Sequence, residues 1–343
     1  VPDGNRGLVD YLDAGRMGRY IELTYDAYHR AFPEHFGTTL DGAFYDEPTF
    51  HWVAGGRAWT ESFNDHFTAE HGSDPNPLYP ALWFDIGPET AAARSALLGF
   101  RATLFARAYV KTLADWCDAR GIELTGHVDQ EEIVNPVGLG GDLMRVFEHQ
   151  HVPGVDQIMT RGRASRAYKI VTSAAQNYGH EKVMVECYGA IKDMPPAVLN
   201  KELIDLFTKG VNVMVPHGVW YDPAPEAVVF QPELSDRDAT YGPVLPAYNE
   251  LVARLQAVLQ RGRAAADVAV LYPIASLQAG YHFSDLDPYH GGMTPPDADY
   301  MEVGERLSLE VRRDFTYLHP DVLDARCRID GDLLRLESAS HEG

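Results

Sequence analysis

The feature that most constrains the fold of this 343-residue chain is a regular alternation of helical stretches with short apolar stretches. A short apolar run between helices is typical of a strand that is buried on both faces of a parallel sheet. The sequence predicts five such strands in succession, at 40–46, 122–127, 154–159, 182–188 and 211–215. Helices are expected around these strands, among them a long one at 91–119 and a short one at 142–150. This pattern predicts an α/β fold with a parallel sheet.

The number of these strands bears on the kind of sheet. A closed TIM barrel needs eight βα units, whereas residues 1–273 supply five in succession. We therefore expect residues 1–273 to be the later part of a (β/α)8 TIM barrel, about strands 4 to 8, whose first three strands lie upstream in the same protein. An open, doubly wound five-stranded sheet is the alternative. For residues 274–343 we expect a linker and the beginning of an accessory α/β domain, with a helix at 300–313 and a strand at 314–318.

Composition and charge narrow the possible partners. The chain has 50 Asp and Glu against 29 Lys and Arg, and its net charge of −21 repels nucleic acid and anionic membranes. No apolar run approaches the ~18 residues of a membrane helix, and the first residues are unlike a signal peptide. We therefore expect a soluble protein with neither partner, and leave its compartment open. The three cysteines are far apart and odd in number, which favours neither a disulfide framework nor a zinc site.

Two of the predicted strands end in a glutamate, Glu47 and Glu186. In a β/α barrel the chemistry takes place at the carboxyl ends of the strands. Two carboxyl groups there are typical of glycoside hydrolysis, which needs one acid to protonate the leaving oxygen and one carboxylate to activate water or attack the sugar. We predict Glu47 as the general acid and Glu186 as the base or nucleophile. The structural alternatives are a helix-capping turn for Glu47 and an acid paired with an arginine for Glu186.

Further polar side chains follow the second predicted strand. His127, Asp129 and Glu131 offer the donors and acceptors that sugar hydroxyls need, and Asp46 joins them from its place beside Glu47. Asp46 would also raise the pKa of Glu47 by repulsion, together with the apolar surroundings that Phe44, Tyr45 and Pro48 supply. Oxygen ligands suit calcium, although the spacing of these residues matches no recognised loop motif.

Aromatic residues follow the last two of the five strands. His217, Trp220 and Tyr221 come directly after one strand, and Tyr188 lies two residues after Glu186. Aromatic rings stack on the apolar faces of sugars, so these four residues could form a substrate platform. Ordinary aromatic packing beneath a loop is the alternative.

Six segments, in this order, carry a resemblance to a known family. They are Phe44-Tyr45-Asp46-Glu47-Pro48, Gly126-His127-Val128-Asp129-Gln130-Glu131, Gly141-Asp142-Leu143-Met144-Arg145, Gly154-Val155-Asp156-Gln157-Ile158, Glu186-Cys187-Tyr188-Gly189-Ala190 and the stretch from Gly210 to His217. With Val270-Leu271-Tyr272-Pro273 after them, they make the chain resemble the catalytic barrel of bacterial glycosyl hydrolases related to the inverting α-L-rhamnosidases.

The resemblance implies the fold, the reaction and the site. It implies cleavage of a terminal α-L-rhamnoside or a similar sugar with inversion, by an acid at the end of strand 4 and its partner at strand 7, where Glu47 and Glu186 fall. It implies a calcium ion near the sugar, for which Glu131 is a possible ligand; no other cofactor is expected. It also implies upstream strands and flanking β-sandwich domains in full-length members.

Two other functional classes remain open. One is a metal-dependent barrel lyase or isomerase that uses His127, Asp129 and Glu131. The other is a carbohydrate-binding barrel without catalysis.

Overall fold

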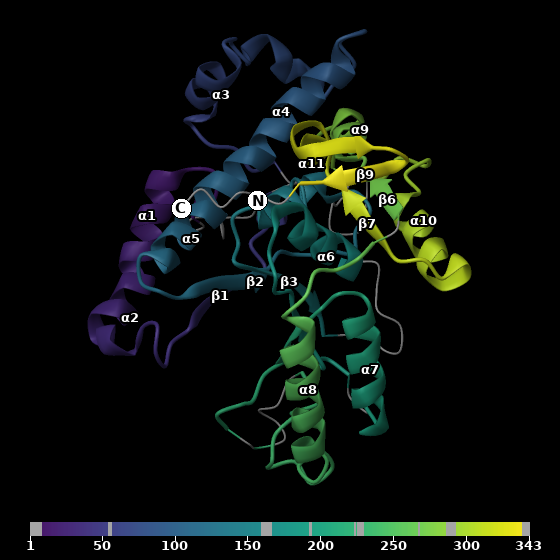
Figure 1. Cartoon of the computed structure of the whole chain (residues 1–343). Coiled ribbons are helices and arrows are strands. Elements are labelled where there is room, and N and C mark those ends of the chain that lie inside the picture. Colours follow the sequence, from purple (N-terminus) through teal and green to yellow (C-terminus); the bar gives the residue numbers. More distant parts are fainter. Residues whose placement is uncertain are drawn as a thin grey trace.

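The computed structural model describes residues 9–53, 57–158, 167–191, 194–222, 224, 230–266, 268–285 and 293–337. Its centre is a five-stranded sheet in which every neighbouring pair of strands is parallel (Figure 1). The strands are β1 (Gly42–Asp46), β2 (Glu123–His127), β3 (Val152–Gln157), β4 (Met184–Cys187) and β5 (Val213–Pro216). The predicted succession of parallel strands is confirmed, with each boundary within two residues of its expected place.

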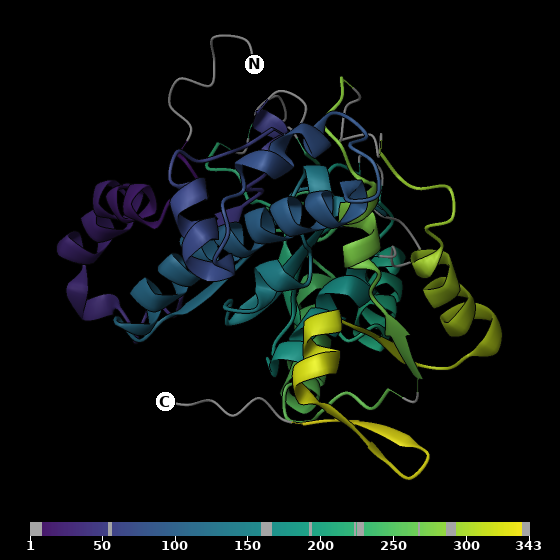
Figure 2. The same ribbon diagram turned by 90° about the horizontal axis from the view of Figure 1, so that it is seen from above.

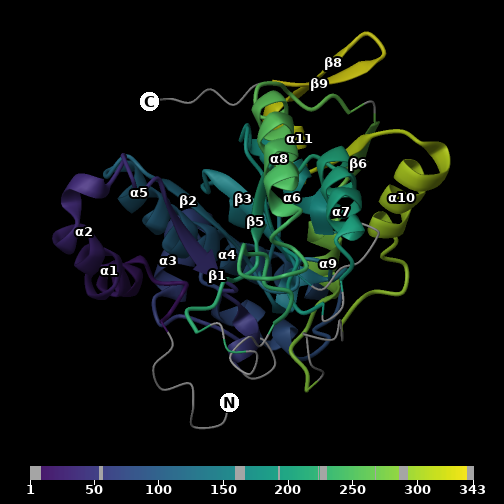
Figure 3. The same cartoon turned by 90° about the horizontal axis from the view of Figure 1, so that it is seen from below.

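The order of the strands distinguishes between the two sheets expected from the sequence. The order β1-β2-β3-β4-β5 follows the chain without reversal. A doubly wound sheet changes direction at a switch point, so that alternative is wrong. The sheet curls like half a barrel, and β1 and β5 each lack a second neighbouring strand among the described residues. Figure 3 shows α7 (Ala197–Thr208) and α8 (Leu245–Leu259) beside β5.

The helices before and between these strands follow the predicted pattern with local breaks. The long helix predicted at 91–119 consists of α4, a π-helical segment (Ala106–Lys111) and α5, and it ends before Gly121, which adopts the left-handed φ of 67°. The helices are α1 (Ala14–Leu23), α2 (Tyr25–Ala31), α3 (Phe63–His71), α4 (Thr90–Phe105), α5 (Thr112–Asp118), α6 (Ala167–Tyr178), α7 (Ala197–Thr208) and α8 (Leu245–Leu259).

The helix expected at 142–150 is absent, and that prediction is wrong. Only a 3-10 turn, Arg145–Phe147, forms there. Asp142 starts this turn, because its Oδ1 accepts hydrogen bonds from the backbone nitrogens of Met144 and Arg145. The Gln150 side chain then donates to the backbone oxygens of Gly126 and Val152, which directs the chain into β3 instead of continuing a helix.

After α8 the chain forms a small second sheet. Strand β6 (Val268–Leu271) pairs in parallel with β7 (Phe315–Leu318), so the strand predicted at 314–318 is confirmed. Helices α9 (Ile274–Gly280) and α10 (Tyr300–Arg306), followed by the π-helical Leu307–Val311, connect these strands, and α11 (Pro320–Arg326) follows β7. Strands β8 (Cys327–Asp330) and β9 (Leu333–Leu336) form an antiparallel hairpin that extends away from the rest of the molecule (Figure 2).

Helix α6 joins the second sheet to the first. Tyr317 of β7 donates its backbone N–H to Ser173 Oγ (2.9 Å), and Asn177 Nδ2 donates to the backbone oxygen of Tyr317 (2.8 Å). The backbone nitrogen of His319 donates to Asn177 Oδ1 (3.0 Å). Side chains of α6 therefore satisfy backbone groups along β7. No helix among the described residues is long and apolar enough to cross a membrane.

Candidate active site

The carboxyl ends of all five strands of the main sheet carry acids or histidines. Parallel strands place these ends at one edge of the sheet, which we call the mouth. Each strand contributes in turn. The residues are Asp46 in β1 and Glu47 after it, His127 in β2 and Asp129 and Glu131 after it, Asp156 in β3, Glu186 in β4 and His217 after β5.

Glycine allows the first three strands to approach closely below the mouth. Gly126 has φ of 130°, and a Cβ there would lie 2.1 Å from the backbone oxygen of Tyr45. A Cβ on Gly154 would lie 2.3 Å from the backbone oxygen of Gly126. Larger residues cannot fit at these two positions, so glycine permits the β1–β2–β3 spacing that brings Asp46 beside His127.

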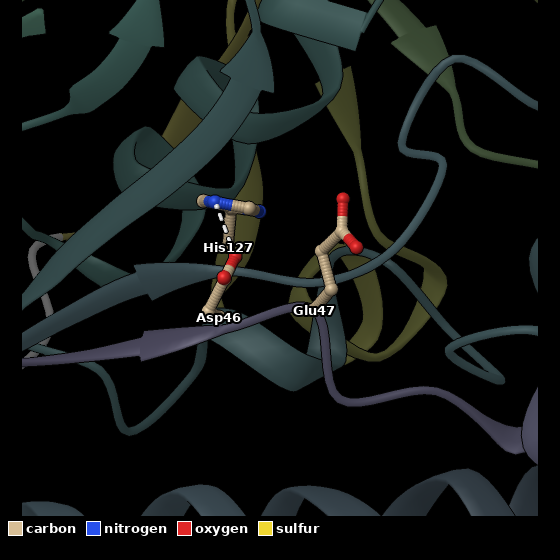
Figure 4. Close-up of side chains that lie close together, drawn as sticks. All are labelled: Asp46, Glu47 and His127. Carbon is tan, nitrogen blue, oxygen red and sulfur yellow. Dashed lines mark ion pairs between the residues drawn. The ribbon is translucent and has the colours of Figure 1, made fainter. Parts of the chain in front are cut away.

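His127 contacts acids from several strands of the mouth, and Figure 4 shows it beside Asp46 and Glu47. Its ring is fully buried, and Nε2 lies 2.8 Å from Glu186 Oε2 and 3.3 Å from Asp46 Oδ1. Its Nδ1 lies 3.3 Å from the backbone oxygen of Val128 and 4.0 Å from Glu131 Oε1. Acceptors therefore face both ring nitrogens, which is the arrangement of a charged imidazolium with two donors.

The surroundings of His127 favour the same charge state. Burial alone would lower its pKa, but the hydrogen bond to Glu186 and the charges of Glu131 and Asp156 raise the pKa of His127 to about 10. The ring is then positively charged at neutral pH and donates to Glu186. A fully buried ring is unsuited to contact a sugar directly, so the structure places His127 behind the carboxylates.

Glu47 occupies a strained and half-buried position at the end of β1. Its φ is 46°, a left-handed conformation that is uncommon outside glycine, and its backbone N–H donates to His127 O (3.2 Å). Burial, followed by repulsion from Asp129, Asp46 and Asp156, raises the pKa of Glu47 to about 7. A carboxyl group with this pKa can hold a proton near neutral pH and release it in a reaction.

Asp129 and Glu131 are buried deeper, at 3% and 1% exposure. Burial raises the pKa of both carboxyl groups. Within the described residues, Asp129 Oδ2 and Glu131 Oε1 have no hydrogen-bond partner. Each atom could be satisfied by a proton or by a cation, because an unpartnered buried carboxylate oxygen is costly.

Comparison with known proteins gives the family. The sequence matches the model of glycoside hydrolase family 106, described as alpha-L-rhamnosidase, over residues 2–279. The chain belongs to this alpha-L-rhamnosidase family. Among solved structures it is similar to a rhamnosidase from Novosphingobium sp. PP1Y, with 20% sequence identity and a TM-score of 0.66. The match covers 96% of this chain and 31% of that one, so the chain spans about a third of that protein's length. No curated protein matches the chain.

Two places in this rhamnosidase-family chain can be compared as metal sites. Ligand atoms of Asp46, Glu47 and His127 lie within 4.8 Å of one another. That set does not fit calcium, because the His127 ring is protonated and calcium takes oxygen ligands. Asp129 Oδ2 and Glu131 Oε1, which have no hydrogen bond among the described residues, fit better, since both are buried carboxylate oxygens.

The aromatic residues predicted from the sequence fall into two groups. The His217 ring lies 5.7 Å from the rings of Trp220 and Phe230, and its Nε2 lies 3.9 Å from Glu186 Oε1. Tyr221 is fully exposed, and no ring contact of its side chain is found among the described residues. The structure therefore brings His217 and Trp220 to the mouth and leaves Tyr221 in solvent.

Tyr188 lies away from the carboxylates. Its hydroxyl donates to Leu199 O (3.2 Å) and lies 2.8 Å from the hydroxyl of Tyr248, and the residue is 2% exposed. Its left-handed φ of 63° turns the side chain toward α7 and α8. The structure does not bring this predicted platform residue to the mouth.

Sequence reasoning missed Asp156 and Phe230. Asp156 pairs in register with Glu186, is half-buried, and has its pKa raised, chiefly by burial. It is the acid of the Gly154–Ile158 segment that carried part of the family resemblance, so the signal was present. Phe230 is half exposed beside His217 and had no such signal, because it lies 14 residues after β5.

Proposed function

We propose that this chain forms the catalytic part of an α-L-rhamnosidase that hydrolyses a terminal α-L-rhamnoside or a similar sugar. One observation carries the proposal: Glu47 and Glu186 each have a carboxylate oxygen near the same buried imidazole, and the pKa of Glu47 is raised to about 7. The two acids thus differ in environment, as the acid and the base of a glycosidase must. The family membership supports the same reaction.

In the proposed reaction, Glu47 donates its proton to the glycosidic oxygen as the bond from that oxygen to the anomeric carbon breaks. Glu186 takes a proton from a water molecule, whose oxygen bonds to the anomeric carbon from the opposite side. One water is consumed, and the two carboxyl groups exchange protonation states. Inversion requires roughly 6.5–9.5 Å between the carboxyl groups, whereas retention requires roughly 5–5.5 Å. We favour inversion, because the family that the sequence resembles works that way.

The remaining mouth residues have supporting roles in this proposal. His127 fixes Glu186, and Asp46, Asp156, His217 and Trp220 surround the sugar. Glu131, with Asp129, would hold a calcium ion, whose positive charge would orient sugar hydroxyls. Chelation followed by calcium addition tests this role, since isothermal titration should then detect calcium binding that Glu131→Gln weakens.

For the architecture, we propose that β1 to β5 are strands 4 to 8 of a TIM barrel. Both outer strands, β1 and β5, have an open edge among the described residues, which three upstream strands of the same protein would cover. Residues 1–273 would form this barrel part, and residues 274–343 would begin the next domain. The β6–β7 pairing and the contacts of α6 hold the start of that domain against the barrel.

The experiment is an assay of the full-length protein on aryl α-L-rhamnosides and other aryl glycosides, with proton NMR of the first sugar formed. Release of β-L-rhamnose from the α-linked substrate would establish inversion. Sugar binding without hydrolysis would instead support a carbohydrate-binding barrel. Conversion of a free sugar that chelation abolishes would support a metal-dependent lyase or isomerase.

A further inference from the structure

Arg101 in α4 is a charged side chain that the proposed reaction does not use. It is fully buried, and it is among the largest side chains with that degree of burial. Burial lowers its pKa to about 10, so it still carries its charge at neutral pH. Removing a cation from water costs free energy, so a buried arginine is expected where its contacts have a specific role.

Three aromatic rings surround this charge. The guanidinium carbon lies 4.5 Å from the centre of the Phe50 ring, 5.6 Å from that of Phe283 and 5.9 Å from that of Trp59. Such distances allow cation–π attraction, which is strong where water is excluded. The closest ring, Phe50, belongs to the segment that follows Glu47.

A hydrogen bond joins the same guanidinium to the segment that follows Glu131. Arg101 Nη2 donates to the backbone oxygen of Val137 (2.6 Å). The two segments also bond to each other, since the backbone N–H of Phe50 donates to Leu139 O (2.8 Å). Arg101 therefore contacts both segments behind the mouth, one leading from Glu47 and one from Glu131.

The fit of the second segment against α4 is close. Gly141 has φ of 78°, and a Cβ there would lie 2.9 Å from the Cβ of Ala102, the residue next to Arg101. This leaves no space for the segment to move toward the helix.

We propose that Arg101 is a positioning residue that holds the Glu47 segment and the Glu131 segment in register. The proposal rests on the proposed function of Glu47. Arg101 is fully buried, and among the described residues it acts through Phe50 and Val137. An arginine that only filled the core would be replaceable by methionine, because buried charges often exchange for apolar residues without loss of stability.

The test compares Arg101→Met and Arg101→Lys with Arg120→Met in the full-length protein. Arg120 is a matched control, because it also stacks on an aromatic ring, Trp116 at 4.0 Å, and bonds to an acid, Asp26. It lies near the start of β2, at the end of the strand opposite the mouth. We expect kcat of Arg101→Met to fall about tenfold or more with KM within about twofold, Arg101→Lys to recover part of the loss, and Arg120→Met to keep kcat.

Hydrogen–deuterium exchange gives a readout that does not depend on activity. Peptides covering 48–53 and 135–142 should exchange faster in Arg101→Met and, to a smaller extent, in Arg101→Lys. Wild-type exchange and wild-type kcat in a folded Arg101→Met would overturn the positioning role. If Arg101→Met does not fold, Arg101→Lys decides by the same two measurements. A wild-type protein that cleaves no glycoside would refute the proposed function alone, and the exchange rates would still decide whether Arg101 holds the two segments.

Discussion

Two buried histidines each bond to a carboxylate, yet they lie in regions with opposite character. At the mouth, His127 Nε2 lies 2.8 Å from Glu186. At the junction of the two sheets, His319 Nε2 lies 2.9 Å from Asp142 Oδ2. Both rings are almost fully buried. The two histidine–carboxylate pairs have almost the same hydrogen-bond length, but the groups around each pair differ.

The second ring nitrogen shows the difference. Nδ1 of His127 faces two acceptors, Val128 O and Glu131 Oε1. Nδ1 of His319 instead accepts a hydrogen bond from the backbone N–H of Asp321 (3.2 Å), so its proton sits on Nε2. The first ring therefore faces acceptors at both nitrogens, whereas the second ring faces an acceptor at Nε2 and a donor at Nδ1.

The carboxylates differ in the same way. At the junction, Asp142 accepts hydrogen bonds through both oxygens, and the neighbouring His319 and Arg145 lower its pKa against the effect of burial. At the mouth, Asp129 and Glu131 each keep an oxygen without a hydrogen bond among the described residues, and Glu47 is strained. Buried polar groups whose hydrogen bonds are all satisfied usually stabilise the fold. Buried acids that repel one another and lack hydrogen bonds are typical of a ligand-binding site.

The largest expected effect is that of Glu186→Gln, which breaks the mouth pair. The amide can still accept a bond from His127 but cannot take a proton from water, so kcat on an α-L-rhamnoside should fall about 10³-fold. Asp142→Asn is the matched change at the junction, and it should lower the melting temperature while kcat stays at the wild-type value. Wild-type kcat in Glu186→Gln would remove this residue from the mechanism.

Glu47→Gln should have the next largest effect, and its size should depend on the leaving group. The amide cannot donate a proton, so kcat should fall about 10²-fold for a sugar leaving group. A nitrophenyl leaving group needs little protonation and should lose much less. Rates on two rhamnosides that differ only in this group check the prediction. Equal losses on both would contradict an acid role.

Replacing each of the two histidines by glutamine should have smaller effects, and it compares the two regions directly. Glutamine retains an N–H donor but no charge. At the mouth, His127→Gln should lower kcat about tenfold, because Glu186 loses its cationic partner. At the junction, His319→Gln should change the free energy of unfolding by less than about 1 kcal/mol, because an amide side chain can also donate to Asp142 and accept from Asp321 N–H. Urea unfolding and kcat of both variants provide the measurement, and equal losses would show that the two pairs do not differ.

Much of this fold could be predicted from sequence, because apolar runs and helix periodicity report burial directly. The five strands and the acids at two of their ends followed from that pattern. The helix expected at 142–150 did not form, because the side chains of Asp142 and Gln150 bond to the backbone instead. Hydrogen bonds from side chains to the backbone follow no periodic pattern in the sequence, so the sequence did not indicate them.

The site was harder to predict, because strand order alone does not give side-chain direction. His127 could be placed at a strand end, but its complete burial depends on the close approach of β1, which Gly126 permits. Tyr188 could be placed near Glu186, but its positive φ turns it toward Tyr248. A positive φ in a residue other than glycine has no sequence signal. Only the structure could therefore show which of the predicted aromatic residues reach the mouth.

The smallest expected effect is on the pH dependence of stability. It tests whether the ionised Glu47 at the mouth destabilises the folded protein. The pKa of Glu47 is about 7 in the folded protein against an ordinary value of 4.5. Below pH 4.5 the carboxyl group is protonated in both the folded and the unfolded state, so its ionisation costs the fold nothing. Between pH 4.5 and 7 the unfolded state releases the proton first, and the folded state loses relative stability until the penalty is complete above pH 7. Glu47→Gln removes that penalty.

The variant should therefore be more stable than the wild type at pH 8, by about 1 kcal/mol after solvent screening of a half-exposed group, and should show no gain at pH 4. Urea unfolding of both proteins at pH 4, 6 and 8 measures the difference. The same variant loses activity, so a gain in stability that appears only above pH 4.5 would tie the strained, crowded acid to function. A difference that is constant with pH would mean that Glu47 ionises alike in both states, which would contradict a raised pKa of this carboxyl group in the folded protein.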